Sequence, residues 1–402
     1  MDATAASASA PIPLAWPDLG PAEEAEVLKV LRSGQLALGP KTLEFERMVA
    51  DFAGVGWGAA VSSGTGGLHL AVRALGVGPT DCVVTTSFSF VASANCVRYE
   101  GAEPVFVDID PETLCLSPDA VKAYLASCRE EGGELHDPTS GRRVAAILPV
   151  DVFGHPADLP AIRALAQPFG IPILSDSCES LGSRIRRGDG TEVHAGADAD
   201  VAVFAFYPNK QITTGEGGMV VGSDAEIADR IRSPRNQGRR ADDPWLRHTR
   251  VGFNYRIDEM SAALGVAQMR RIAEILARRA EVMSRYREEL AGVEELGLPR
   301  TAEWADPAWF VMHLRTRNAA ARNALIERLA ADGIEAEAYF DPPIHLQPAY
   351  GDRAEAGIPL PVTEAAAGTT LIVPFFSTLR REQVERVCRS LMRGLAGARR
   401  SA

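Results

Sequence analysis

Short apolar runs alternate with helical patterns over residues 59–222 of this 402-residue chain, and this alternation constrains the fold more than any other feature. Residues 68–76, 117–127 and 157–170 carry apolar side chains at helical spacing. The apolar runs between them are typical of strands buried on both faces. They are AAVS (59–62), DCVVTT (81–86), PVFVDI (104–109), VAAILPV (144–150), IPILSD (171–176), VAVFAF (201–206) and MVVG (219–222). The pattern predicts an α/β fold with a mostly parallel central sheet flanked by helices.

The chain changes character after Asn254. Residues 257–295 predict a long helix with one break, and beyond it we expect a strand at 310–316 and helices at 319–332 and 381–395. A chain of this length is too long for one compact core. We expect an N-terminal arm over residues 1–20, a large α/β domain over 21–260 and a smaller α+β domain over 261–402. Polar, glycine-rich stretches at 128–143, 184–198 and 236–250 are predicted loops or small insertions.

Composition excludes several classes of protein. The net charge of −11 argues against a nucleic-acid partner, which needs a basic surface. No apolar run approaches the roughly 20 residues that span a membrane, and the first ten residues lack the basic and apolar regions of a signal peptide. The six cysteines form no C-x-x-C pair, so we expect no metal, and buried free thiols in a reducing cytoplasm are the simplest interpretation.

One lysine has no charged neighbour until Glu216. Lys210 lies in FAFYPNKQITTGEGGMVV (204–221), just after the predicted strand at 201–206. Pro208 ends that strand, because proline has no N–H to donate to a neighbouring strand. Ligands of open α/β sheets bind beyond the carboxyl ends of the strands. We therefore expect Lys210 to lie in a binding site.

Other segments would meet Lys210 at this edge of the sheet. SSGTGG (62–67) precedes a helix and suits a phosphate, although an ordinary glycine-rich turn explains it as well. Asp176 ends a predicted strand and could keep a ring nitrogen protonated, or it could cap a helix. Of Phe88 and Phe90 in SFSF (87–90), one could stack on a planar ring, although most such aromatics belong to the core. With the lysine, these features fit pyridoxal 5′-phosphate (PLP), whereas a nicotinamide site would leave the lysine without a role.

The sequence resembles the DegT/DnrJ/EryC1/StrS family of PLP-dependent sugar aminotransferases, which have the fold-type I (aspartate aminotransferase-like) fold. The resemblance extends from about residue 14 to the C-terminal helix. The motifs that carry it are SGQLALGPKTLEFE (33–46), SSGTGGLHLAVRALGVGPTD (62–81), GAEPVFVDIDPETL (101–114), FYPNKQITTGEGGMVV (206–221), GFNYRIDEMSAALG (252–265) and PPIHLQPAY (342–350).

The resemblance implies roles for individual residues around the cofactor. Lys210 matches the lysine that binds PLP covalently and moves the proton during transamination. Asp176 matches the partner of the pyridine nitrogen, and Glu179 stands where the family has Gln or Glu near the ring hydroxyl. Phe90 matches the aromatic residue stacked on the ring. The turn that binds the phosphate is matched by Gly64 and Thr65.

The resemblance also implies contacts beyond the ring. Asn254 matches an asparagine that reaches the phosphate of the neighbouring subunit, which implies a homodimer with shared active sites. His345 lies in a motif that approaches the sugar nucleotide in several relatives. The sequence departs from the family at Ala205, five residues before the lysine, where many members have a serine that binds the phosphate.

The activity implied is transfer of an amino group from glutamate to a nucleotide-linked keto sugar, for amino-sugar or polysaccharide biosynthesis. Thr213, Thr214 and Glu216 favour amination at C4 of a 4-keto-6-deoxyhexose, with C3 as the alternative. Arg235, Arg239 and Arg240 could contact the pyrophosphate, although a solvated basic loop explains them at least as well.

Two other functions are possible within this fold. Dehydratases of the family that use pyridoxamine phosphate have a histidine in place of the lysine, so Lys210 argues against that activity. A non-catalytic regulator is the second alternative, and no basic segment or helix-turn-helix supports it.

Overall fold

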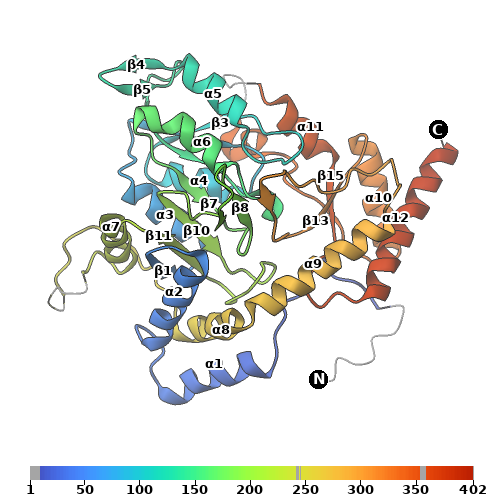
Figure 1. The fold of residues 1–402 in the computed structure, drawn as a ribbon, viewed down its shortest axis with the longest axis horizontal. Helices are drawn as coiled ribbons and strands as arrows, with labels where there is room; N and C mark the ends of the chain where they lie inside the picture. Colours follow the sequence, from blue (N-terminus) through green and yellow to red (C-terminus); the bar gives the residue numbers. More distant parts are fainter. Residues whose placement is uncertain (1–9, 241–243, 245, 354–358, 402) are drawn as a thin grey trace.

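The computed structural model describes residues 10–240, 244, 246–353 and 359–401 (Figure 1). The first nine residues of the predicted N-terminal arm lie outside this range. A central sheet forms the middle layer of the larger unit, and helices cover both of its faces. Its strands, in the order in which they lie side by side, are β1 (Trp57–Val61), β11 (Gly218–Gly222), β10 (Val201–Ala205), β7 (Leu174–Asp176), β6 (Arg143–Leu148), β2 (Asp81–Thr86) and β3 (Glu103–Val107).

Most neighbouring strands of this sheet are parallel. β10 and β7, β6 and β2, and β2 and β3 form parallel pairs. Parallel bridges join Ile147 to Ile173 and Val150 to Asp176, and these bridges connect β6 with β7. Only β11 among these strands is antiparallel to its neighbours, β1 and β10. The predicted α/β fold with a mostly parallel sheet is confirmed.

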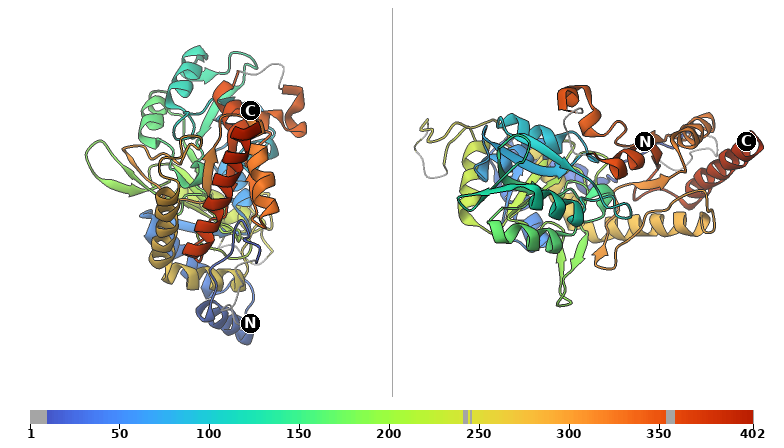
Figure 2. Two further views of the ribbon diagram at one scale, coloured as in Figure 1. Left: turned by 90° about the vertical axis from the view of Figure 1, so that its right-hand side faces the viewer. Right: turned by 90° about the horizontal axis from the view of Figure 1, so that it is seen from above.

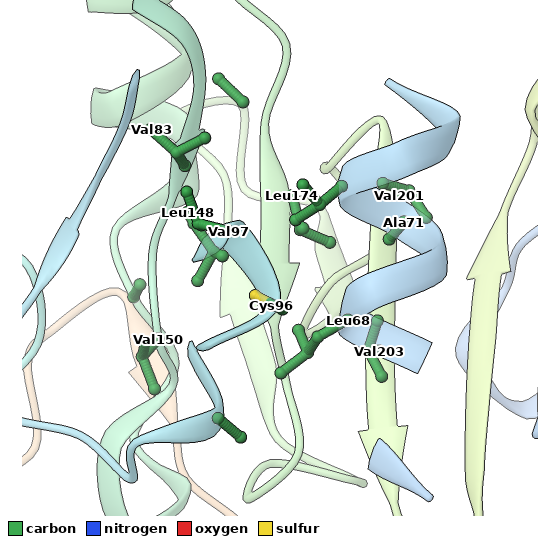
Figure 3. Close-up of a cluster of buried hydrophobic side chains, with 14 of the residues drawn as sticks. Leu68, Ala71, Val83, Cys96, Val97, Leu148, Val150, Leu174, Val201 and Val203 are labelled. Atoms are coloured by element: carbon green, nitrogen blue, oxygen red, sulfur yellow. The ribbon is translucent and has the colours of Figure 1, made fainter. Parts of the chain in front are cut away.

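Successive residues of each strand face opposite layers of helices. Val201 and Val203 of β10 pack in the cluster that contains α3, with Ala71 beside Val201 and Leu68 beside Val203 (Figure 3). Ala202 and Phe204 pack in the cluster on the other face. The first face carries α3 (Gly64–Ala74), α4 (Ala92–Tyr99) and α7 (Ala225–Arg235). The second carries α2 (Pro40–Ala53), α8 (Glu259–Arg270), α5 (Pro118–Ser127) and α6 (Leu159–Ala166).

The predicted long helix has one break, at Arg271, where α8 ends and α9 (Ile272–Glu289) begins. α9 leads from the large sheet to the C-terminal unit (Figure 2). Its residues Val282 and Tyr286 pack in a separate core with Leu314 and Leu391. That unit consists of an antiparallel sheet of β13 (Met312–Arg315), β15 (Thr370–Val373) and β14 (Glu337–Ala338), with α10 (Ala319–Ala331), α11 (Pro361–Thr369) and α12 (Arg381–Ser401). Ile12 pairs with Ile334, so this part of the N-terminal arm docks on the C-terminal unit.

Sequence reasoning missed several elements. α1 (Pro21–Ser33), α2, α4, α7, α11, β14 and β15 were not predicted. α1 and α2 carry local signals, since each begins with proline and is followed by a glycine with positive φ. Two predicted loop segments form hairpins, which are β4 (Arg129–Glu131) with β5 (Glu134–His136) and β8 (Arg184–Arg186) with β9 (Glu192–His194). No helix in the described residues is both long and apolar enough to cross a membrane.

Candidate functional site

A cavity of about 500 Å³ opens at the carboxyl ends of β7 and β10. Residues far apart in the sequence meet there because neighbouring parallel strands end at the same edge of the sheet. The lining includes six residues that the sequence predicted to bind the cofactor, namely Gly64, Thr65, Phe90, Asp176, Glu179 and Lys210. Ala205, Tyr207, Asn209, Glu216 and Tyr339 also contribute. The volume suits a small organic cofactor and part of a substrate.

Lys210 follows a tight turn after β10. Its backbone N–H donates to the carbonyl of Tyr207 at 2.9 Å. The side chain is only 13% exposed, and its Nζ donates to Oε1 of Glu179 at 3.2 Å. Nζ also lies 3.9 Å from the centre of the Phe310 ring. The amine is therefore held between a carboxylate and an aromatic face.

Glu179 is buried, and both of its carboxylate oxygens have partners. Oε1 receives Lys210, and Oε2 accepts the backbone N–H of Phe153 at 3.0 Å. Burial raises the pKa of this carboxyl group, while Lys210 and the N–H of Phe153 act in the opposite direction. Phe153 has a φ of 59°, a left-handed conformation that is uncommon for a bulky residue. The hydrogen bond from Phe153 to Glu179 and that from Phe310 to the carbonyl of Phe153 hold this conformation.

Asp176 ends β7, and both oxygens of its carboxylate accept hydrogen bonds. Oδ2 accepts the hydroxyl of Ser93 at 2.7 Å, and Oδ1 accepts the N–H of Cys178 at 3.2 Å. Turns rather than a helix follow Asp176, so it does not cap a helix. An ionised carboxylate has about four acceptor positions. The hydrogen bonds from Ser93 and Cys178 do not use all of these positions, so the carboxylate can also accept from a ligand such as a protonated ring nitrogen.

Gly64 and Thr65 begin α3 at the edge of the cavity. Ser63 caps this helix by accepting the N–H of Gly66 at 3.0 Å, and the first N–H groups of a helix have no partner within it. A Cβ atom on Gly64 would lie 2.8 Å from the Cβ of Ala205 and 3.1 Å from Sγ of Cys178. Only glycine allows α3 to approach β10 this closely. Because the first N–H groups of α3 have no partner within the helix, its N-terminus can bind an anionic group.

The two phenylalanines of SFSF have opposite environments. Phe88 is 0% exposed and packs against Phe153 and Phe340, whereas Phe90 is 64% exposed and lines the cavity. Phe88 therefore belongs to the core, and of the two rings Phe90 is the one that a planar ligand in the cavity could contact.

Asn254 and His345 do not line this cavity. Asn254 is exposed at the surface of the subunit. His345 lies beside Ser87, with its Nδ1 atom 2.6 Å from the serine hydroxyl, and its Nε2 atom is 3.4 Å from Oε1 of Glu364. Ser87 precedes Ser89 by two residues, and Ser89 lines the cavity, so His345 lies near the cavity without lining it.

Arg235, Arg239 and Arg240 line a second cavity of about 850 Å³, together with Trp57 and Arg256. Arg235 is committed to an ion pair with Glu46 and donates to the carbonyl of Ala60 at 2.7 Å. Asn236 receives hydrogen bonds from Arg239 and Arg256. Within one subunit, these arginines are not brought together with Lys210.

Thr213, Thr214 and Glu216, on which the prediction of C4 amination rests, do not all line the cavity. The hydroxyl of Thr213 donates to the carbonyl of Phe206 at 3.0 Å, and that of Thr214 donates to the carbonyl of Glu216 at 2.7 Å. Both threonines are buried, and they shape the loop that follows Lys210. Only Glu216 of the three lines the cavity.

Sequence reasoning missed Ser93, Asn209, Phe310 and Tyr339. Ser93 lies on α4 and Tyr339 follows β14, and no local motif marks either residue. Asn209 had a signal, because it immediately precedes the lysine. Its Oδ1 atom is buried in the cavity wall and has no hydrogen-bond partner among the described residues, as expected of a group that meets a ligand.

The residues present fit PLP. The cavity brings together the amine of Lys210, the carboxylate of Asp176 and the exposed ring of Phe90. It also contains the N-terminus of α3, whose close approach to β10 requires the glycine at position 64. When bound, PLP supplies an aldehyde that takes up an amino group and a protonated ring that accepts electrons from the adjacent carbon. Asp176 is placed to hold the ring nitrogen protonated, and the Lys210 amine to accept and return a proton. Glu179 keeps that amine oriented.

Comparison with known proteins agrees with this site. The model of the DegT/DnrJ/EryC1/StrS aminotransferase family matches residues 17–392. A dTDP-3-amino-3,4,6-trideoxy-alpha-D-glucose transaminase of Streptomyces venezuelae is 35% identical over 93% of this chain and 92% of its own length. A UDP-N-acetyl-3-dehydro-alpha-D-glucosamine 3-aminotransferase of Acidithiobacillus ferrooxidans is 34% identical over 92% of each chain. DesV of S. venezuelae, solved in complex with a ketimine intermediate, has a TM-score of 0.82 at 35% identity and covers 92% of this chain and 93% of its own.

The match extends over almost the whole chain and over the elements that build the cavity. The chain therefore belongs to the DegT/DnrJ/EryC1/StrS family, with the PLP fold-type I architecture, and it is a PLP-dependent sugar aminotransferase.

Proposed function

We propose that this enzyme transfers the amino group of glutamate to a keto carbon of a nucleotide-linked sugar. The observation that carries the proposal is the meeting of Lys210, Glu179 and Asp176 in one cavity. The names of the two relatives specify dTDP- and UDP-linked sugars, and this supports a nucleotide sugar as the substrate. Glutamate as the donor rests on the family resemblance.

We assign the roles within the subunit as follows. Lys210 binds the cofactor and moves the proton, and Asp176 pairs with the ring nitrogen. Phe90 covers one face of the ring. The N-terminus of α3 at Gly64 and Thr65 receives the phosphate, and without a serine at Ala205 this contact depends more on backbone N–H groups.

We also propose a homodimer in which Asn254 completes the site of the partner subunit. In support, Asn254 is exposed and is not brought to the cavity of its own chain. The second cavity, with Arg235, Arg239 and Arg256, lies on the segment that precedes and follows Asn254 in the sequence. These arginines can contact a substrate pyrophosphate only if the active site of the partner subunit lies against the second cavity.

The position of amination on the sugar is C3 in our proposal. Both relatives named above carry a 3-amino or 3-dehydro sugar in their names. The C4 prediction rested on Thr213, Thr214 and Glu216, and the two threonine hydroxyls are bound to backbone carbonyls. C4 remains the second candidate, because Glu216 lines the cavity and can reach a sugar hydroxyl.

A substrate panel tests the proposal. The purified protein is incubated with glutamate, PLP and 3-keto or 4-keto sugars linked to UDP, GDP or dTDP, and mass spectrometry detects replacement of oxygen by an amino group. Two-dimensional NMR of the product then locates the new C–N bond. Nitrogen at C4 would reverse our assignment of the ring position, and absence of amination with every sugar would contradict the substrate class.

A further inference from the structure

The backbone on both sides of Asn254 is fixed, although its side chain is exposed. The N–H of Phe253 donates to the carbonyl of Pro234 at 2.7 Å, and the carbonyl of Tyr255 accepts the N–H of Ser62 at 2.8 Å. Asn254 itself pairs with Asn236 in an antiparallel bridge. Its side-chain amide has no hydrogen-bond partner in the part of the chain that the structure describes. The segment thus presents a free amide outward on a rigid support.

The support extends to α3 through the side chain of Tyr255. The tyrosine hydroxyl lies 3.2 Å from Nδ1 of His69, and Nε2 of His69 lies 2.8 Å from Oε1 of Glu100. A carboxylate can only accept, so Nε2 carries the hydrogen and Nδ1 accepts from Tyr255. His69 is buried, and burial lowers the pKa of its imidazole. The neutral ring then satisfies both partners at once.

A second contact from α3 holds the other neighbour of Asn254. Arg73 lies one helical turn after His69, binds Glu100 at 3.0 Å and places its guanidinium 5.4 Å from the centre of the Phe253 ring. The rings of Phe253 and Tyr255 stack on each other at 5.0 Å, and His69 contacts both. The two aromatic residues that flank Asn254 are therefore fixed by one face of α3.

We infer that His69 is a positioning residue for the active site of the partner subunit, because it fixes Tyr255 and thereby the direction in which Asn254 points. The inference rests on the proposed shared site. The same helix starts at Gly64, in the cavity of its own subunit. α3 then acts on two sites. Its N-terminus lies in the site of its own subunit, and His69 acts through Tyr255 and Asn254 on the site of the partner subunit.

Two substitutions separate the hydrogen bonds of His69. His69→Gln places its amide near the position of Nε2, so it keeps the contact with Glu100 and loses Tyr255. His69→Asn places its amide near Nδ1 and keeps Tyr255. Loss of an oriented hydrogen bond to a phosphate weakens binding by about tenfold. We expect His69→Gln to weaken PLP binding by this factor, measured by titration of the cofactor-free dimer, and His69→Asn to restore most of it.

Mixed dimers decide which site is affected. In a hybrid of His69→Gln and Lys210→Ala subunits, the intact Lys210 belongs to the His69→Gln subunit and receives Asn254 from a subunit with normal His69. We expect activity and PLP affinity to recover in this hybrid. In the reverse hybrid, a wild-type subunit faces a subunit that carries both substitutions, and the one remaining site should be as weak as in His69→Gln.

Three outcomes would overturn the inference. The first is normal PLP affinity in the His69→Gln homodimer. The second is a hybrid with Lys210→Ala that stays impaired, since His69 would then act on its own subunit through α3. The third is failure of the control, a hybrid of Asn254→Ala and Lys210→Ala, which should be active. If this control is inactive, the proposed shared site is wrong, and the inference fails with it. Should His69→Gln not fold, Tyr255→Phe removes only the hydroxyl and enters the same experiment.

Discussion

Nζ of Lys210 lies 3.2 Å from Oε1 of Glu179, and the other oxygen of the same carboxylate accepts the N–H of Phe153. Glu179 is thus held by a backbone group on one side while it holds the amine on the other. Because the carboxylate cannot rotate without losing one of the two partners, the amine is oriented before any ligand binds. Phe153 has a left-handed conformation, and in it the N–H of Phe153 donates to Glu179.

Lys210→Ala should abolish amino transfer, since no other lysine lines the cavity among the residues that the structure describes. The sequence has four lysines, at positions 29, 41, 122 and 210. Borohydride treatment of the PLP-loaded wild type should attach the cofactor to the peptide that contains Lys210, as seen by mass spectrometry. Lys122→Ala is the matched control and should behave as the wild type. Covalent attachment in Lys210→Ala would show that another lysine anchors the cofactor.

Phe90→Ala should weaken PLP binding and Phe88→Ala should lower stability, although the two residues are only two positions apart. Phe90 is largely exposed in the cavity, so its loss should leave the unfolding free energy nearly unchanged and weaken PLP binding. Phe88 is fully buried, and its truncation should cost about 3–5 kcal/mol of stability. Thermal unfolding without cofactor and PLP titration measure the two effects. A large loss of stability in Phe90→Ala would contradict its assignment.

Ala205→Ser should tighten PLP binding. Ala205 lines the cavity, and its Cβ lies beside Gly64 at the start of α3. A serine hydroxyl at this position would add a donor for the phosphate, as the family resemblance implies. A net contribution of about 1 kcal/mol corresponds to about fivefold in affinity. Titration of the cofactor-free protein with PLP measures the change, and unchanged or weaker binding would place the phosphate elsewhere.

Asp151→Asn should change how stability depends on pH. Asp151 is fully buried and accepts from Ser180 at 2.5 Å and from the N–H of Ala157 at 2.8 Å, and burial raises its pKa from 3.8 to about 6. Between these values the folded protein binds the proton and the unfolded chain does not. The unfolding free energy of the wild type should therefore fall by about 3 kcal/mol through this group as the pH rises from about 4 to about 6.

The asparagine variant lacks this titration. Urea unfolding of both cofactor-free proteins at several pH values should show the variant gaining stability relative to the wild type over the same range. The other titrating groups are common to both proteins, so their contributions cancel in the comparison. A difference that does not change with pH would contradict the raised pKa of Asp151.

The sequence alone determined the central sheet, because strands buried on both faces must be apolar along their whole length. It also determined the residues at the strand ends. Asp176 and Lys210 were predicted to meet because parallel neighbouring strands end at one edge, and the cavity contains both. The order of motifs around Lys210 was sufficient to indicate the family and the cofactor.

Only the tertiary structure decided what depends on contacts between distant segments. Phe88 and Phe90 have the same side chain and similar neighbours in sequence, and only packing buries one and exposes the other. Thr213 and Thr214 resemble substrate contacts until their hydroxyls are found on backbone carbonyls. Tyr339 reaches the cavity, and Ser93 reaches Asp176 behind it, from segments that no local pattern marks. A residue type predicts which interactions a side chain can make, and the fold determines which partner lies within reach.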